Sequence, residues 1–459
     1  MDGIIFNDLD DFKIPARSAG AYRIASIARQ HGFKIKVIDF VTYALDNDPA
    51  KLFNAVRNYI TPDTKIIGFS TTFLNIDYTH TDRKKKLLYF TKLLNKYFPH
   101  VKIIFGGQSA NSVKFKELCG DMVHQVHGFG EAAILKFLTN NDNNKFEFDF
   151  HNVGPMFHQS DNLQLNEVLP LELSRGCRFA CKFCSFPLLG RNPNDLSYIR
   201  SYDSIYNELV FNYENFGTTN YYMLCDTFNE STQKLKTIQK AISDLGVSIK
   251  FSAYIRLDLL HAFPEQIDIL KNMGIQSAFF GIESLNDPSA KAIGKGLGKE
   301  RTLDTIKRVK EAWPDALLFG SFIVGLPHET QYTANEWCNF LADGGSFLDS
   351  YRIGGLAMHK NSVISSEFER NFEKYGYSFN EDGWFNEHWT SRTAQDFSHG
   401  VMENIKDRNK ITSWHALGLL NYNMAWSDII NITVDELDQP RFVNLKNEFI
   451  KDYFTNHYD

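Results

Sequence analysis

Three cysteines lie within eight residues of this sequence, in the stretch CRFACKFC at residues 177–184. Cys177, Cys181 and Cys184 make up half of the six cysteines in the chain. A structural zinc site usually takes four Cys or His ligands, and a thioredoxin-type redox pair would leave Cys177 without a role. Because iron–sulfur clusters are normally held by four thiolates, three thiolates suit a cluster that keeps one iron open. A purely structural metal site stays the alternative.

The composition restricts the classes of protein that could use such thiols. The chain has 459 residues, 43% of them hydrophobic, and a net charge of −6, which is not the basic footprint of a nucleic-acid-binding protein. No apolar run approaches the roughly 18 residues of a membrane span, and the acidic start MDGIIFNDLDDF does not resemble a signal peptide. Six cysteines in so long a chain do not form a disulfide scaffold. We therefore expect a cytoplasmic protein without membrane or nucleic-acid partners.

The first 140 residues alternate short apolar runs with helix-like stretches, as a parallel α/β sheet requires. Helices are predicted at 19–32 and 83–97, and a linker with an asparagine-rich start at 141–167. Paired glycines end neighbouring strands, where ligands bind in doubly wound sheets, although such glycines can equally serve only to make turns. The predicted strands are 3–6, 34–40, 65–70, 101–107 and 122–130.

A second α/β series fills residues 168–356 and predicts a partial (β/α)6 barrel of the TIM type. In such folds the active groups lie at the carboxyl ends of the strands, and CRFACKFC directly follows the first strand of the series. Beyond it, residues 357–459 are predicted to be mainly helical. The predicted strands are 169–176, 220–226, 248–256, 275–283, 317–325 and 350–356, and the helices between them are 201–215, 264–273, 300–312 and 331–342.

The cysteine stretch resembles the C-x3-C-x2-C signature of the radical S-adenosylmethionine (SAM) superfamily, including the aromatic Phe183 before the third cysteine. The resemblance implies that Cys177, Cys181 and Cys184 bind a 4Fe–4S cluster whose open iron chelates SAM. One-electron reduction then cleaves SAM to methionine and a 5′-deoxyadenosyl radical. It also implies a small-molecule or peptide substrate and an electron donor such as flavodoxin or ferredoxin. No catalytic residue is assigned.

Four further segments, each at the end of a predicted strand, resemble the SAM-binding segments of that family. With the cysteine stretch they occur in the family's order and cover residues 168–330. They are CDTFNES (225–231), SAYIRLD (252–258), GIESLNDPSAKAIGKG (281–296) and SFIVGLPHET (321–330).

The first two segments contribute Asp226 and Thr227, which the resemblance places near the SAM amino group, and Arg256 at the end of the third strand. An ordinary ion pair at the surface is the alternative for Arg256.

The last two segments and the cysteine stretch contribute the remaining implied SAM contacts. Glu283 would bond the ribose hydroxyls, and Lys295 would meet the SAM carboxylate unless it is only a solvated loop charge. The backbone from Ile323 to Gly325 would border adenine, with Phe183 as a further wall.

Residues 1–140 resemble the cobalamin-binding domain, of Rossmann-like fold, that precedes many radical SAM barrels. The D-x-H-x-x-G motif with its cobalt-ligating histidine is absent, and the loop at 7–20 contains Arg17 but no histidine. Either the domain binds cobalamin without that histidine or it has kept the fold and lost the cofactor, because fold is a poor guide to a retained ligand. The strand-end residues that would surround the corrin or its nucleotide tail are Ser70, Thr71, Gly106, Gly107, Gly128 and Glu131.

We therefore expect a radical SAM enzyme, and a methyltransferase if cobalamin binds. A cobalamin-independent oxidoreductase or cyclase is the alternative, and a non-catalytic iron–sulfur or zinc protein is a third possibility. His124 and His127 share one face of a strand and are not expected to bind a second metal. Trp384 and His388 are candidates for a substrate pocket.

Overall fold

The computed structural model of the chain describes residues 1–459 except 8–13, 73–80, 108–109, 111–112, 142–145, 147, 187, 193, 361–364 and 459. It contains two compact units. The first comprises Met1–Leu165, Phe211–Gly217 and Val443–Asp459, and the second comprises Asn166–Val210 and Thr218–Phe442. Within the described part of the chain, no helix has the length and apolar character needed to cross a membrane.

The first unit is built on a parallel sheet of five strands in the order β2-β1-β3-β4-β5. Every residue of β1 and β2 is buried, as expected for parallel strands covered on both faces. The order reverses between β1 and β3, the point beyond whose carboxyl ends ligands bind in doubly wound sheets. All five strands were predicted: β1 Gly3–Phe6, β2 Ile35–Ile38, β3 Ile66–Ser70, β4 Lys102–Gly106 and β5 Val123–Gln125.

Helices and a C-terminal segment complete the first unit. Phe449 and Tyr453 of α18 (Pro440–Tyr458) pack their rings against Phe40, at centroid distances of 6.1 and 5.0 Å. The predicted helices are α1 and α4, and the shorter ones were not predicted. The helices are α1 Ala19–Gln30, α2 Val41–Asn47, α3 Pro49–Val56, α4 Thr81–Tyr97, α5 Val113–Cys119 and α6 Gly130–Thr139.

The second unit contains six parallel strands in the sequential order β11-β10-β9-β8-β7-β6. Strands β6 and β11 are the edges of this sheet, so it is an open six-stranded counterpart of a (β/α) barrel. The predicted α/β fold class is confirmed. The strands are β6 Leu169–Leu171, β7 Asn220–Met223, β8 Lys250–Ile255, β9 Ile275–Glu283, β10 Leu317–Val324 and β11 Ser350–Gly355.

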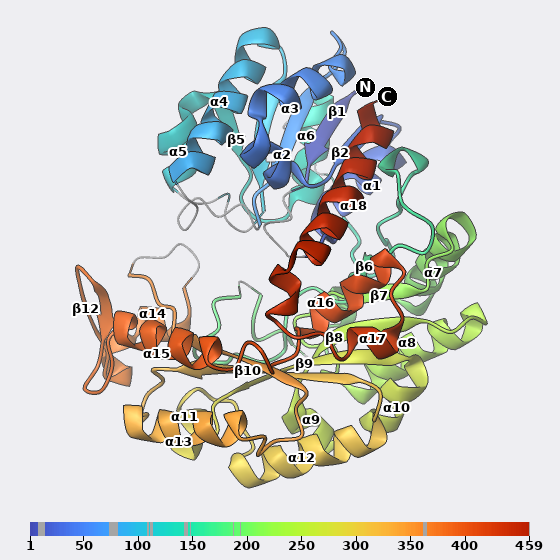
Figure 1. Ribbon diagram of the computed structural model, residues 1–459. Coiled ribbons are helices and arrows are strands. Elements are labelled where there is room, and N and C mark those ends of the chain that lie inside the picture. Colours follow the sequence, from blue (N-terminus) through green and yellow to red (C-terminus); the bar gives the residue numbers. More distant parts are fainter. Residues whose placement is uncertain are drawn as a thin grey trace. The chain divides into compact units, whose positions relative to one another are not determined.

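Helices follow the strands of this sheet (Figure 1). The apolar faces of the helices at Thr232–Leu245 and Lys299–Ala312 are buried. The helix α8, for example, is capped at its start by Ser231, whose side chain accepts from the Lys234 amide, and at its end by Gly246 in the left-handed region. The helices are α7 Tyr202–Phe216, α8 Thr232–Leu245, α9 Leu257–Ala262, α10 Glu265–Met273, α11 Asp287–Ala292, α12 Lys299–Ala312 and α13 Gln331–Ala342.

The stretch after β11 is largely helical, as predicted, with α14 Glu367–Arg370, α15 Ser391–Glu403, α16 Ser413–Gly418 and α17 Trp426–Ile429. It also contains an unpredicted antiparallel hairpin of β12 (Ser378–Asn380) and β13 (Gly383–Phe385). The Asn380 side chain accepts from the Asp382 amide, and Gly383 takes a φ of +117°. These two turn features close the hairpin within a few residues.

Candidate functional site

The carboxyl ends of the parallel strands lie at one edge of the second sheet, and the predicted SAM-site residues follow them. Parallel strands all point the same way, so residues directly after them gather at a common edge. The structure therefore brings together segments that are up to 150 residues apart in the sequence. The residues at or just beyond the strand ends are Cys177 (β6), Asp226 and Thr227 (β7), Arg256 (β8), Glu283 (β9), and Ile323 and Gly325 (β10).

The cysteine loop is closed at its base by main-chain bonds. The Cys177 amide donates to the Leu188 carbonyl at 2.9 Å, and the Arg191 amide donates to the Cys177 carbonyl at 3.0 Å. Gly176 precedes this bridge with a φ of +106°, and a Cβ there would lie 2.8 Å from the Leu188 oxygen. The glycine is therefore required for the chain to return so closely on itself.

The middle of the loop is held from two other segments. The Lys182 amide donates to the Ile293 carbonyl at 3.0 Å, and the Lys182 carbonyl accepts from the Phe368 amide at 3.0 Å. The Lys182 ammonium also pairs with Glu367 at 2.7 Å. Sequence reasoning missed Glu367 and Phe368, because nothing local marks residues so far along the chain as partners of the cysteines.

The three thiols lie on this loop as free cysteines, with Cys177 buried and the other two half-buried. Burial raises the pKa of the Cys177 and Cys184 thiols. Two groups lie in hydrogen-bonding range of the Cys177 sulfur, the Thr227 hydroxyl at 3.2 Å and the Phe179 amide at 3.4 Å.

No three Cys, His, Asp or Glu side chains of the described residues are placed to share one metal ion. The thiolates of a four-iron cluster bind different irons, so this arrangement does not argue against a cluster. Three thiols on one closed loop, with hydrogen-bond donors directed at sulfur, are a donor set that an iron–sulfur cluster accepts. The residues present therefore fit the group that the resemblance implies.

Asp226 is bound to the base of the cysteine loop. Its Oδ2 accepts from the Gly176 amide at 2.9 Å. Burial raises the pKa of Asp226 to about 6, against the opposing effect of that hydrogen bond. Next to it, the fully buried Lys234 ammonium pairs with Glu230 and donates to Ser174, both at 2.7 Å. Sequence reasoning quoted the segment that contains Glu230 but missed the role of this pair.

Arg256 is 7% exposed and faces the cysteine loop. Its Nη1 lies 3.3 Å from the Cys181 sulfur, and its guanidinium carbon lies 4.0 Å from the centre of the Phe179 ring. Asp258 pairs with Nη2 at 2.5 Å. The alternative of an ordinary surface ion pair does not describe this nearly buried side chain.

Glu283 and Lys295 form an ion pair of 2.8 Å at the end of β9, with side chains 8% and 14% exposed. Glu283 has a φ of +70°, an uncommon conformation for a residue with a side chain. Gly281 makes room for the pair, because a Cβ there would lie 2.5 Å from Nζ of Lys295. The Lys295 ammonium is also 5.9 Å from the centre of the Phe183 ring. Lys295 is therefore not a solvated loop charge.

The turn after β10 depends on Gly325, which has a φ of +89° and would bring a Cβ within 2.7 Å of the Trp384 ring. The Gly325 amide donates to Glu329 at 2.8 Å, and its carbonyl accepts from the Tyr377 hydroxyl at 2.8 Å. Burial raises the pKa of Glu329 to about 7. Tyr377 and Glu329 support this turn and were not singled out from the sequence.

The two residues suggested for a substrate pocket differ in their surroundings. Trp384 is 1% exposed, and its Nε1 donates to the Leu356 carbonyl at 2.9 Å. It is therefore a core residue that packs beneath Gly325. By contrast, the side chain of His388 is 36% exposed, and its Nε2 lies 3.8 Å from a carboxylate oxygen of Glu387.

The predicted cobalamin contacts lie at the carboxyl ends of β3, β4 and β5 in the first unit. The Thr71 amide and hydroxyl both donate to the Gly106 carbonyl, at 2.7 and 3.1 Å. Gly107 has a φ of +112°, and a Cβ there would lie 2.8 Å from a Thr72 hydroxyl. A Cβ at Gly106 or Gly128 would meet no atom of the described residues within 4 Å. The strand ends of β3 and β4 are thus tightly joined.

The other two predicted cobalamin contacts lie beside these positions. Ser70 is the last residue of β3 and is half-buried. Glu131 is buried in the first turn of α6. All six predicted positions therefore lie at or close to one edge of the first sheet.

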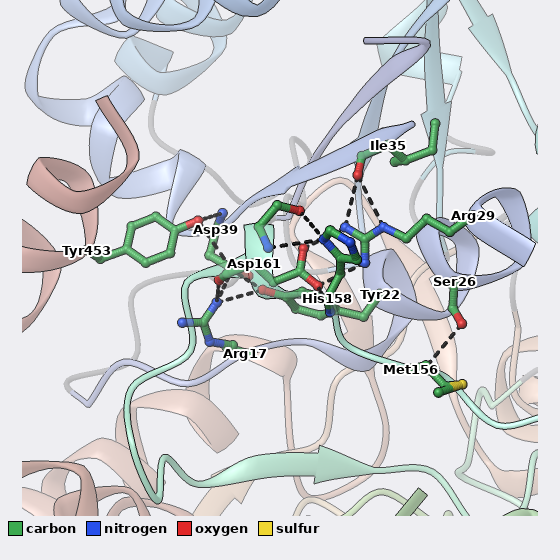
Figure 2. Close-up of polar contacts among 11 residues, drawn as sticks. Arg17, Tyr22, Ser26, Arg29, Ile35, Asp39, Met156, His158, Asp161 and Tyr453 are labelled. Atoms are coloured by element: carbon green, nitrogen blue, oxygen red, sulfur yellow. Dashed lines mark hydrogen bonds and ion pairs between the residues drawn. The ribbon is translucent and has the colours of Figure 1, made fainter. Parts of the chain in front are cut away.

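Arg17, in the loop that lacks a histidine, is buried in a polar network (Figure 2). Its Nη1 pairs with Asp39 at 2.8 Å and donates to the Tyr22 hydroxyl at 2.7 Å. The Asp161 carbonyl accepts from the same nitrogen at 2.9 Å, and the Tyr453 ring lies 5.3 Å from the guanidinium carbon. The charge of Arg17 is therefore neutralised within the protein. Residues 8–13 of the loop lie outside the described residues.

Part of the segment predicted as a linker packs against α1 in this network. The Met156 amide donates to the Ser26 hydroxyl at 3.0 Å. Arg29 binds both carboxylate oxygens of the fully buried Asp161, at 2.9 and 2.6 Å (Figure 2). Hydrogen bonds and an ion pair therefore join this part of the segment to α1.

Residues 171–341 match the family model of the radical SAM superfamily. An uncharacterized methyltransferase from Pyrococcus horikoshii is 32% identical over 160 residues, which are 34% of this chain and 33% of that protein. The ribosomal protein uS12 methylthiotransferase RimO of Sulfurimonas denitrificans is 26% identical over 185 residues, which are 38% of this chain and 40% of that protein. The chain thus spans only 33% to 40% of the length of these curated relatives.

Two solved structures share the fold over nearly the whole chain. One is the radical SAM methyltransferase TsrM of Kitasatospora setae, solved with tryptophan and a SAM analogue, with a TM-score of 0.65 at 12% identity and 99% coverage of both chains. The other is the cobalamin-dependent SAM radical enzyme OxsB, with a TM-score of 0.57 at 15% identity, covering 99% of this chain and 71% of that one. Residues 171–341 therefore form a radical SAM domain, in a chain that has the fold of TsrM.

Proposed function

We propose that this chain is a radical SAM enzyme that binds a 4Fe–4S cluster through Cys177, Cys181 and Cys184. The observation that carries the proposal is the closed loop of three thiols at the carboxyl edge of the second sheet, inside the range that matches the superfamily. When bound, a cluster with one open iron supplies the electron that cleaves SAM to methionine and a 5′-deoxyadenosyl radical.

The surrounding residues would bind and orient SAM. Lys295 contacts Oε1 of Glu283, and among the described residues no hydrogen bond reaches Oε2. That oxygen is suited to accept hydrogen bonds from ribose hydroxyls. The Gly325 turn, whose amide and carbonyl already have protein partners, would offer shape rather than new bonds to adenine, with Ile323 and Phe183 as apolar walls.

We further propose that the enzyme is a cobalamin-dependent methyltransferase of a small-molecule or peptide substrate. The fold neighbours support this: TsrM is a methyltransferase that has also been solved with cobalamin and a [4Fe–4S] cluster, and OxsB has been solved with aqua-cobalamin and SAM. The strand order of the first unit supports it too, because its switch point is where ligands bind in such sheets. A cytoplasmic location and an electron donor such as flavodoxin or ferredoxin belong to the same proposal.

One observation favours the alternative of a radical SAM oxidoreductase or cyclase without cobalamin. Arg17 is a cationic residue of the loop after β1, and its guanidinium binds Asp39, Tyr22 and two main-chain carbonyls. Arg17 is therefore not free to bind the lower face of a corrin. Lys13, the other cationic residue of this loop, lies outside the described residues.

Anaerobic reconstitution of the full chain with iron and sulfide tests the proposal. We expect about four irons per chain and release of 5′-deoxyadenosine from SAM after addition of a low-potential reductant. Zinc binding without iron, or no product from SAM, would contradict it. Cobalamin added to the same sample distinguishes the two enzymes: retained corrin absorption and S-adenosylhomocysteine formation indicate the methyltransferase, and their absence at saturating cobalamin indicates the alternative.

A further inference from the structure

Two of the residues predicted to contact SAM lie against the thiols. Arg256 Nη1 is 3.3 Å from the Cys181 sulfur, and the Thr227 hydroxyl oxygen is 3.2 Å from the Cys177 sulfur. A thiolate carries no proton, so the hydroxyl and the guanidinium must be the donors once the cysteines bind metal. Each of these two thiols therefore has a side-chain donor from a neighbouring strand end.

The direction of the Arg256 side chain is fixed by three contacts. Asp258 accepts from Nε at 3.0 Å and from Nη2 at 2.5 Å, so one side of the guanidinium is fully used. The Phe179 ring stacks at 4.0 Å. Because the guanidinium is planar and rigid, this leaves Nη1 directed at Cys181.

The main chain of Arg256 is held as well. The Asn229 side chain accepts from the Arg256 amide at 2.9 Å and donates to the Arg256 carbonyl at 3.1 Å. Asn229 is fully buried. This two-way bond fixes the strand end from which the guanidinium projects.

Thr227 is held just as firmly. It is 4% exposed, and its carbonyl accepts from the Lys234 ammonium at 3.2 Å. Lys234 also donates to Ser174 and Glu230, both at 2.7 Å, and all three residues are buried. The hydroxyl of Thr227 therefore projects from a rigid main chain.

We propose that Arg256 and Thr227 are positioning residues of the cluster, which donate hydrogen bonds to the thiolates of Cys181 and Cys177 and thereby raise its reduction potential. Hydrogen bonds to the sulfur ligands, and positive charge beside them, stabilise the more negative reduced state. The inference rests on the proposed function, because it requires the cluster to bind at these cysteines.

The experiment is a redox titration of the anaerobically reconstituted full chain, with the reduced cluster followed by electron paramagnetic resonance. Thr227→Val removes the donor at nearly constant volume, and we expect a more negative potential. Thr227→Ser keeps the hydroxyl and should restore the wild-type value. Arg256→Gln should give the largest negative shift, and Arg256→Lys, which keeps the charge but not the planar fork, a smaller one.

A second readout is the rate at which a chelator removes iron in the absence of SAM. Loss of an outer hydrogen-bond partner typically weakens metal binding by about 10- to 100-fold, so we expect Thr227→Val and Arg256→Gln to release iron at least about tenfold faster. Lys406→Gln is the matched control, because it removes a charge of the second unit that pairs with Glu403 at 2.9 Å and belongs neither to the cysteine loop nor to a strand end. Its potential should stay near that of the wild type.

Wild-type potentials in both Thr227→Val and Arg256→Gln would overturn the inference. So would a Thr227→Ser shift as large as that of Thr227→Val, because the effect would then not come from the hydroxyl. If Arg256→Gln does not fold, the potentials of Thr227→Val, Thr227→Ser and Arg256→Lys still test the inference. A wild-type chain that fails to bind iron or to cleave SAM would instead contradict the proposed function.

Discussion

The carboxyl edges of the two parallel sheets differ in the types of residue that lie there. At the edge of the second sheet, thiols, carboxylates and cations lie in contact with one another, as in the 2.8 Å pair of Glu283 and Lys295. At the edge of the first sheet, the predicted ligand contacts are mostly Gly, Ser and Thr, and the charged residues Arg17 and Asp39 are buried in a network of their own.

The difference shows that residue types alone can identify a functional site at one sheet edge and cannot do so at the other. Thiols at fixed spacing are rare enough to identify a function from the sequence. Small residues at strand ends indicate only that a ligand has room to approach. The second edge should therefore depend on a few individual side chains for its chemistry, whereas the buried charges of the first unit should matter for stability.

The largest expected effect is the loss of the cluster from the second edge. Cys177→Ala, Cys181→Ala or Cys184→Ala should abolish nearly all bound iron after anaerobic reconstitution, because each removes one of three ligands. Cys338→Ala is the matched control: this buried free cysteine lies in α13 and should leave iron content unchanged. Full iron content in any of the first three variants would contradict the assignment.

Stability of the first unit should be the next most sensitive property. Asp39→Asn leaves the Arg17 charge buried without its partner, with side chains 1% and 2% exposed in the wild type. Breaking a buried pair in this way costs about 3–5 kcal/mol, measurable as the free energy of unfolding in urea. Arg392→Ala, which breaks an exposed pair with Asp396, should have little effect. An Asp39→Asn chain as stable as the wild type would show that the network is not essential.

A pH dependence should distinguish the second unit. Burial raises the pKa of Glu329 from 4.5 to about 7, so between these values the folded chain holds a proton that the unfolded chain releases. The contribution of Glu329 to stability is therefore greatest below about pH 4.5 and falls as pH rises to about 7, by on the order of 3 kcal/mol. Glu329→Gln should remove that fall from the unfolding free energies measured across this range. An unchanged slope would mean that Glu329 ionises normally.

The smallest expected effect concerns the turn after β10. Gly325→Ala forces a side chain into a left-handed conformation and against the Trp384 ring, so we expect a loss of about 1–3 kcal/mol of unfolding free energy and weaker SAM binding. Gly400→Ala, in helix α15, is the control, since its Cβ would meet no atom within 4 Å in the part of the chain that the structure describes. It should stabilise the chain by about 0.5–1 kcal/mol. Equal effects of the two substitutions would argue against a special role for the turn.

The sequence was sufficient to predict the strands of both sheets and the loop that carries the cysteines, because these features are local. Each buried parallel strand is a short apolar run, and the three cysteines are adjacent in the chain. The sequence alone leaves open whether Lys295 is a solvated loop charge, because its pairing with Glu283 depends on how the chain folds back after β9.

The remaining features depend on contacts between distant residues, which no local pattern reveals. Glu367 reaches the cysteine loop across 185 positions, and Tyr453 reaches Asp39 across 414. Tyr377 and Trp384 contact the turn at Gly325 because the hairpin at 378–385 places them there. This hairpin is a short element inside a stretch whose composition predicts helix. Its turn signal, Asn380 followed by Gly383, was present but weak.

The central claim is that the cysteine loop holds a cluster with an iron left open for SAM. Electron paramagnetic resonance of the reduced, reconstituted chain with and without SAM tests it most directly. If SAM binds to that iron, the signal of the reduced cluster changes on addition of SAM, and no such signal is present in Cys177→Ala. A signal that is identical with and without saturating SAM would contradict the claim, even if iron is bound.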